Sequence, residues 1–145
     1  MYQLASNYSY EFNLEKAYLK YVFTSTYVPK MVKNKLSQDK INNTINVVCD
    51  NCTLDSLDNI FLKPEILESI CIISNLSPSI FYDNYYSFIF SDYPTKILQW
   101  RQSKKISQKK AARILRISPV DLCNWERKIS YPSRYQFIKL QKVIK

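Results

Sequence analysis

The chain of 145 residues contains no glycine. Glycine is the residue that most readily takes a positive backbone φ, and many sharp helix ends and phosphate-binding loops depend on it. Its absence excludes glycine-rich phosphate loops and the nucleophile elbow of hydrolases. Any left-handed residue at a helix end must therefore carry a side chain, at a cost of roughly 1 kcal/mol.

The chain also lacks histidine, which is the commonest general base and a frequent metal ligand. We therefore expect no enzyme activity, no catalytic residues and no cofactor. The four cysteines include the pair in "CDNC" (49–52), whose spacing is typical of a metal or redox site. A structural zinc site needs four ligands, and a thioredoxin-like pair needs a βαβ setting that the pattern does not indicate. We interpret the cysteines as reduced, buried or incidental thiols with no metal, and keep zinc binding and redox chemistry as alternatives.

Helical periodicity dominates the chain wherever a pattern can be read, and it predicts an all-α fold. In residues 13–23 one helix face carries apolar side chains that we expect to face the core: Leu14, Ala17, Tyr18, Tyr21 and Val22. Further helices are expected to start at serine, threonine or proline residues: Pro29, Ser37, Thr53, Pro64 and Ser77-Pro78.

Aromatic side chains are concentrated in residues 81–93, "FYDNYYSFIFSDY". A buried helix that joins the two halves of the chain is one interpretation, and a stacking platform for single-stranded bases is the other. Stacking platforms need nearby cations, whereas the charged residues of this stretch are Asp83 and Asp92. We therefore favour packing.

Positive charge is confined to the last third of the chain. Residues 1–91 hold 7 basic and 9 acidic side chains (net −2), and residues 92–145 hold 14 and 3 (net +11). This asymmetry predicts a division into 1–91 and 92–145, and it favours an anionic partner for the second part. Neither a signal peptide nor an apolar run of ~18 residues is visible, so we expect a cytoplasmic protein without membrane association.

Residues 106–134 contain the signature of two short helices joined by a tight turn. Ser107 is a predicted N-cap for residues 108–115, and Ser118 with Pro119 predicts a helix start directly after the turn 116–118. The small side chains of Ala111 and Ala112 would let the two helices approach closely. This is the helix-turn-helix arrangement, whose second helix can enter the major groove of DNA.

A set of residues in 94–145 forms a pattern with unbroken spacing: Arg101, Ile106, Ser107, Gln108, Ala112, Leu115, Ile117, Ser118, Leu122, Trp125, Glu126, Tyr131, Pro132 and Ser133. With this pattern, residues 94–145 resemble the Cro/C1-type (Xre-like) helix-turn-helix family, which has the lambda-repressor-like fold. The family has glycine where this chain has Lys105, Arg116 and Lys128, and basic side chains there could interact with helix C-termini and with phosphates.

The resemblance also implies roles for individual residues. Arg101 and Glu126 would form a structural ion pair, and Asn124 would be the strongest base reader because its amide can bond adenine in a bidentate manner. Asp121 is expected to face solvent. The residues expected to face base edges are Pro119, Val120, Cys123 and Asn124. The residues expected to contact phosphates are Ser107, Gln108, Lys109, Ser118, Arg127, Lys128 and Ser130.

Residues 25–90 are a candidate degenerate copy of the same motif. At an offset of 70 residues, "LSQDK" (36–40) aligns with "ISQKK" (106–110), but chance matches of this length are common. Met31 and Ser56 then stand in place of Arg101 and Glu126, and the would-be reading segment is acidic. We expect the first part to be a helical scaffold or dimerisation region, whether or not it is a true repeat.

The leading hypothesis is a sequence-specific transcriptional regulator of a phage, plasmid or other mobile element, which binds double-stranded DNA as a homodimer. The alternative is a phage-encoded inhibitor of the anti-CRISPR type, or an antitoxin. Such a protein would bind a protein partner through residues 1–91 and regulate its own operon through the helix-turn-helix.

Overall fold

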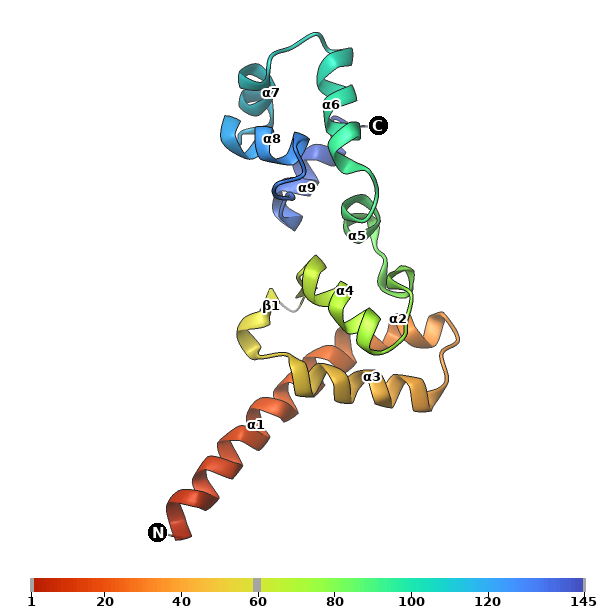
Figure 1. Cartoon of the computed structure of the whole chain (residues 1–145), viewed down its shortest axis with the longest axis vertical. Coiled ribbons are helices and arrows are strands. Elements are labelled where there is room, and N and C mark those ends of the chain that lie inside the picture. The colour runs from red at the N-terminus through yellow and green to blue at the C-terminus, as the bar shows by residue number, and fades with distance from the viewer. Residues whose placement is uncertain (1, 59–60, 145) are drawn as a thin grey trace. The chain divides into compact units, whose positions relative to one another are not determined.

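The computed structural model describes residues 2–58 and 61–144, and over these residues the chain is mostly helical, as predicted (Figure 1). The chain forms two compact units, Met1–Phe81 and Tyr82–Lys145. The division comes earlier than the expected boundary between residues 91 and 92, so the short helix α5 belongs to the second unit. Within the described residues, no helix is both long and apolar enough to cross a membrane.

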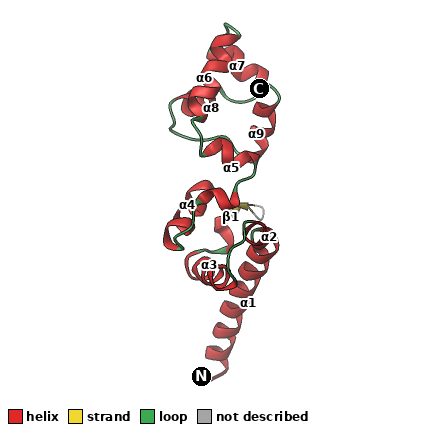
Figure 2. Cartoon of the chain, turned by 90° about the vertical axis from the view of Figure 1, so that its right-hand side faces the viewer, coloured by secondary structure: helices red, strands yellow, loops and turns green. Residues whose placement is uncertain are grey.

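The first unit is built from helices and one very small hairpin, as the colouring of Figure 2 shows. The predicted starts at Pro29, Ser37 and Pro64 are confirmed, and the Ser37 hydroxyl accepts a hydrogen bond from the Lys40 N–H. The elements in chain order are α1 (Tyr2–Thr26), α2 (Val28–Lys33), α3 (Gln38–Asn51), the 3-10 turn η1 (Leu54–Ser56), β1 (Leu57–Asp58), β2 (Phe61–Leu62), α4 (Pro64–Ile73) and the 3-10 turn η2 (Pro78–Phe81).

The buried face of α1 is not the predicted one. Leu19, Val22 and Phe23 are buried, whereas Leu14 and Tyr21 are 54% and 69% exposed. Tyrosine tolerates exposure because its hydroxyl remains hydrated, so it marks the core face less reliably than phenylalanine. Ala17 and Tyr18 are also exposed, so only Val22 of the predicted face is buried. The ring of Phe23 packs against the rings of Tyr27 and Phe81, at centroid distances of 5.1 and 6.5 Å.

The prediction of a helix after Thr53 is wrong. The Ser56 hydroxyl donates to the Thr53 carbonyl (2.6 Å) and accepts from the Thr53 N–H (3.1 Å). Such local bonds offer the backbone an alternative to the helical pattern. The chain instead forms η1 and then the β1–β2 hairpin, in which Leu57 pairs with Leu62. Part of the predicted helix, residues 59 and 60, lies outside the described residues.

The aromatic segment is packed, as predicted, but it is not one continuous helix. The helical turn η2 ends at Phe81. The Asp83 carboxylate then caps a new helix, α5 (Asn84–Ile89), by accepting a hydrogen bond from the Tyr86 N–H at 2.9 Å. Phe81, Tyr85 and Tyr86 are buried. The capping role of Asp83 was not predicted because the apolar pattern of residues 78–90 indicates a single helical run.

The second unit continues with four more helices around one core. The side chains of Ile97, Trp100, Ala111, Leu122 and Trp125 lie in this core. The helices are α6 (Tyr93–Ser103), α7 (Gln108–Leu115), α8 (Pro119–Glu126) and α9 (Arg134–Gln141).

The described part of the first unit does not contain the helix-turn-helix that a degenerate copy would have. α3 runs without interruption from Gln38 to Asn51, through the positions that align with the turn 116–118. The expected reading segment, residues 48–55, is the end of this helix followed by η1. The turn before α3 matches the second unit, and α4 (Pro64–Ile73) covers the positions that align with α9 (Arg134–Gln141).

Candidate nucleic-acid interface

The α7–turn–α8 segment has the geometry that its capping residues predict. The Ser107 hydroxyl accepts from the Lys110 N–H at 3.2 Å, and the Ser118 hydroxyl accepts from the Val120 N–H at 3.1 Å. Pro119 occupies the first turn of α8, where a missing N–H costs nothing. These caps fix where α7 begins and where α8 begins.

Three basic residues occupy left-handed backbone positions at the ends of helices in this unit. Lys105, Arg116 and Lys128 have φ values of 52°, 53° and 57°. These are the positions at which the resemblance expects glycine, so the backbone geometry is kept although the residue type is not. Each basic residue accepts a strain of roughly 1 kcal/mol that glycine would avoid. In return, a cation stands at each helix C-terminus, where it interacts favourably with the exposed carbonyl groups.

Two hydrogen bonds stabilise the turn between α7 and α8. The Ile117 N–H donates to the Ala112 carbonyl at 3.0 Å, and Lys139 Nζ on α9 donates to the Arg116 carbonyl at 3.2 Å. Ala111 and Ala112 are both fully buried. Their small side chains let α7 lie close to α8, as predicted.

An ion pair joins α6 to α8, as the resemblance predicts. Arg101 Nε lies 2.6 Å from Glu126 Oε1, and Arg101 Nη2 lies 3.1 Å from Glu126 Oε2. The two side chains are 18% and 6% exposed. Hydrogen bonding by Glu126 raises the pKa of Arg101, so the guanidinium stays charged. Arg101 also donates to the Ile106 carbonyl at 3.3 Å, which fixes the turn before α7.

Gln108 makes a side-chain contact that was not predicted. Its side-chain Nε2 donates to Glu126 Oε2 at 2.7 Å, and the residue is half-buried. The amide therefore adds a hydrogen bond to the buried Glu126 carboxylate, and its second N–H can still be donated to a phosphate. Sequence reasoning missed this contact because residues 108 and 126 lie on different helices.

The four predicted base-facing residues lie on one face of α8. Positions 119, 120, 123 and 124 are spaced i, i+1, i+4 and i+5, and this face is opposite to buried Leu122 and Trp125. Val120 is 66% exposed and Pro119 is exposed, whereas Cys123 and Asn124 are half-buried. Among the described residues, the Asn124 side-chain amide has no hydrogen-bond partner. Asp121 is half-buried and lies outside this face.

Of the predicted phosphate-contacting residues, Ser118 directly precedes α8, and Arg127 and Lys128 directly follow it. Lys109, Arg127 and Lys128 are exposed, and none of them belongs to an ion pair of the described residues. Ser107 and Ser118 are exposed, but their hydroxyls already serve as helix caps. Their remaining capacity is the hydroxyl hydrogen, which can be donated to an anion.

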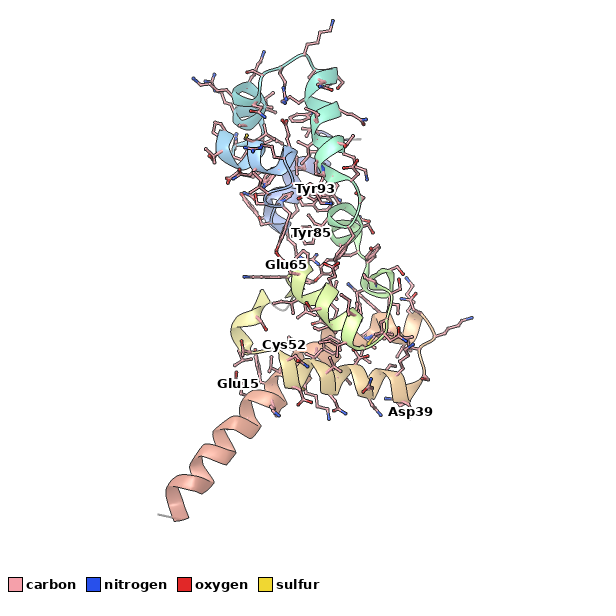
Figure 3. The ribbon with its side chains drawn as sticks, in the orientation of Figure 1. Glu15, Asp39, Cys52, Glu65, Tyr85 and Tyr93 are labelled. Atoms are coloured by element: carbon pink, nitrogen blue, oxygen red, sulfur yellow. The ribbon has the colours of Figure 1, made fainter. Side chains whose placement is uncertain are left out.

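Two tyrosines hold the loop that follows α8, a role that no local pattern in the sequence indicates. Tyr93 Oη donates to the Ser130 carbonyl at 2.9 Å, and Tyr85 Oη donates to the Pro132 carbonyl at 3.0 Å. Both tyrosines are labelled in Figure 3. Burial raises the pKa of Tyr93, so its hydroxyl stays protonated as a donor. The tyrosines thus position the half-buried Ser130 and the end of the basic segment 127–130.

The amino-terminal side of the unit is tied to α9 by a second ion pair. Arg134 Nη1 lies 2.7 Å from Asp83 Oδ2, and the guanidinium lies over the rings of Tyr85 and Tyr86 at 4.6 and 4.7 Å. The only sequence signal for this arrangement was the acidic residue at the start of the aromatic segment. α9 itself starts with a capping box formed by Ser133 and Gln136.

The cysteines outside α8 are protonated and buried to different degrees. Burial is the main cause that raises the pKa of Cys49 and Cys52, and it raises the pKa of Cys71 to about 11. A thiol, unlike a thiolate, is a poor nucleophile and a poor metal ligand. Within the described residues, no group of three or more His, Cys, Asp or Glu side chains could hold a metal ion.

The chain gives no match when compared with protein-family models, with curated proteins and with solved structures. The resemblance to the Cro/C1-type family is therefore a hypothesis carried by the motif residues of the second unit. A functional assignment rests on those residues and on the geometry of α6–α9.

Proposed function

We propose that the protein is a sequence-specific DNA-binding transcriptional regulator whose second unit places α8 in the major groove. The observation that carries this proposal is the α8 face opposite the core, which is exposed at Pro119 and Val120 and is followed by Arg127 and Lys128, cations without an ion pair among the described residues. A two-helix unit of this kind can present its second helix to base edges while the flanking residues contact the backbone.

The charge of the second unit supports a polyanionic partner. Residues 82–145 contain 14 basic and 4 acidic side chains, a net of +10. Two of the four acidic residues, Asp83 and Glu126, are neutralised within the unit by Arg134 and Arg101. The exposed lysines and arginines would release counterions from DNA, so affinity should fall steeply as the salt concentration rises.

The chemistry of the α8 face suggests what it would read. Asn124 can bond both N6 and N7 of an adenine, and Pro119 and Val120 can make apolar contact with thymine methyl groups. We therefore expect an operator with A·T pairs at its centre of contact. Binding as a homodimer would place two half-sites about 34 Å apart on the DNA.

The decisive experiment is selection of bound sequences from a random pool of double-stranded DNA with the full-length protein. Recovery of a palindrome would support the function and give the half-site spacing. The same selection with Asn124→Ala should lose preference at one base position of each half-site. A pool that shows no enrichment after repeated rounds would contradict the proposal.

A second function is favoured by the exposed side chains of α1. Leu14, Tyr18 and Tyr21 are more than half exposed, and tyrosine is enriched in protein interfaces. In this alternative the protein is a phage-encoded inhibitor or an antitoxin that binds a protein through its first unit. Tyr18→Ser combined with Tyr21→Ser would then abolish co-purification of the partner, whereas a regulator without a partner would keep its DNA affinity unchanged.

A further inference from the structure

A hollow in the second unit lies away from the residues that the proposed function uses. It has a volume of about 1230 Å³, and its lining comes from α5, α6, α7, α9 and the last described residues. α8 contributes no residue to it. The helices that surround it can be followed in Figures 1 and 2.

The hollow has an apolar floor. Trp100, Phe137 and Leu140 line it and are themselves nearly buried, and Phe88 and Ile114 add partly exposed apolar surface. An apolar surface of this kind favours a partner that brings apolar side chains of its own. A phosphate backbone would gain little from it, so the floor argues against nucleic acid as the occupant.

The rim of the hollow is basic. Lys96, Lys104, Lys110 and Lys142 contribute to the lining and are exposed, and the described lining contains no aspartate or glutamate. None of these lysines forms an ion pair with a described carboxylate. An occupant with apolar groups on one side and several negative charges on the other would complement both surfaces.

The spacing of the lysines indicates an extended occupant. Lys96 lies near the start of α6 and Lys104 directly follows its end, so they are about 12 Å apart along the helix axis at 1.5 Å per residue. A small molecule with one carboxylate could reach only one end of this row. Ligand pockets for small molecules also have volumes of about 300–1000 Å³, which is less than the volume here.

The hollow and the proposed DNA-reading surface use different sides of α7. Lys110 and Ile114, four residues apart, face the hollow. Lys109, a predicted phosphate-contacting residue, precedes Lys110 by one residue and therefore points about 100° away from it around the helix. Both surfaces can consequently be occupied together.

We propose that the hollow, an apolar groove with a basic rim, binds an acidic amphipathic helical segment of a partner protein. Binding of an amphipathic helix in a hydrophobic groove uses apolar anchors spaced i, i+3, i+4 and i+7. The anchors would lie on the floor formed by Trp100, Phe137 and Leu140, and the acidic side chains would face the lysines. The proposal does not depend on DNA binding by α8.

A synthetic peptide tests the proposal directly. The probe is a fluorescein-labelled amphipathic peptide of about 18 residues, or five turns, with leucine and phenylalanine on one face and glutamate on the other. Two controls have the same apolar face with lysine in place of glutamate, or the same composition in scrambled order. Fluorescence anisotropy with the full-length protein should show that the acidic peptide binds at least about tenfold more tightly than either control.

Two matched variants locate the binding site. Ile114→Asp places a negative charge on the floor, and Ile138→Asp places the same charge on α9 outside the lining; the two isoleucines are 50% and 53% exposed. Because both side chains are already half exposed, neither change should prevent folding. Ile114→Asp should weaken the acidic peptide about tenfold or more, and Ile138→Asp should leave it unchanged.

The outcomes separate this inference from the proposed function. Equal binding of the acidic, basic and scrambled peptides would overturn the inference, as would equal effects of the two aspartate variants. If Ile114→Asp weakened DNA binding and the peptide did not bind, the groove would belong to a nucleic-acid surface and the inference would fail. Loss of DNA binding in Asn124→Ala with peptide binding intact would concern the proposed function alone.

Discussion

The turn between α2 and α3 in the first unit and the turn between α6 and α7 in the second have the same backbone geometry. Lys35 and Lys105 lie 70 positions apart, have φ values of 59° and 52°, and each donates its N–H to the carbonyl three residues earlier, at 2.9 Å. The serine two residues later caps the next helix in both cases, Ser37 for α3 and Ser107 for α7.

The two units differ immediately after this shared start. α7 ends at Leu115, whereas α3 continues to Asn51. The position of Pro119 is taken by Cys49 in the first unit. Proline has no N–H to donate and disfavours the helical conformation in the residue before it, so a helix cannot easily continue through residue 118. Cysteine places no such restriction on the helix. The serines thus predict where α3 and α7 begin, and Pro119 is one difference between the units that favours a new helix start after residue 118.

Removal of the Arg101–Glu126 ion pair, which the first unit lacks at the aligned positions, should have the largest effect. Arg101→Met copies the residue that the first unit has at the aligned position, Met31, which is fully buried. It would leave the Glu126 carboxylate buried without its partner, and we expect a loss of about 3–5 kcal/mol in the free energy of unfolding. Denaturant titration of the full chain would measure the change.

A double variant serves as the control for this prediction. Arg101→Met with Glu126→Leu removes both charges, so it should recover most of the lost stability. If the double variant were as unstable as the single one, packing of the arginine would matter more than its charge.

The proposed base-reading role of α8 is tested next. Asn124→Ala should lower the affinity for the selected operator by about 1–3 kcal/mol while affinity for random DNA stays nearly constant. The matched change Asn46→Ala, on exposed α3 surface in the first unit, should leave both affinities unchanged. Gel-shift titrations would compare the two variants, and equal losses on operator and random DNA would refute the base-reading role.

Charge reversal at a lysine with a positive backbone φ should have a smaller effect on DNA affinity. Lys128→Glu should weaken all DNA binding and reduce the slope of log affinity against log salt by about one unit, because one phosphate contact is lost. Lys35→Glu has the same backbone conformation in the other unit and should change neither quantity. Similar losses from both variants would indicate that the first unit also contacts DNA.

The smallest effect concerns the backbone alone. Arg116→Gly and Lys35→Gly should each raise the free energy of unfolding by up to about 1 kcal/mol, because glycine takes positive φ without strain. For Arg116 the gain is reduced by the loss of its charge near a helix C-terminus. Thermal unfolding would measure both variants, and destabilisation of both would show that side-chain contacts outweigh the backbone strain.

Local signals in the sequence predicted several helix starts, such as those after Ser37, Ser107 and Ser118, but not the one after Asp83. The family resemblance, and not a local signal, predicted the left-handed positions of the second unit. Serine caps and prolines affect the backbone of neighbouring residues only, so their effect can be predicted without knowledge of the fold. The face of α1 was misjudged because tyrosines such as Tyr21 tolerate both burial and exposure. The Gln108–Glu126 bond and the basic-rimmed groove join residues from separate helices, and only the folded chain brings them together.

The contacts of Arg134 determine how much of the chain an intact second unit must include. If recombination joined this domain to another gene at residue 92, Asp83 and the tyrosine rings above the guanidinium would be lost. Arg134 would then be a half-buried cation without its counter-ion, and Phe137 would lose the ring contact of Tyr85, whose centroid lies 5.7 Å away. Recombination would therefore preserve the structure of the second unit only when the breakpoint falls before Asp83.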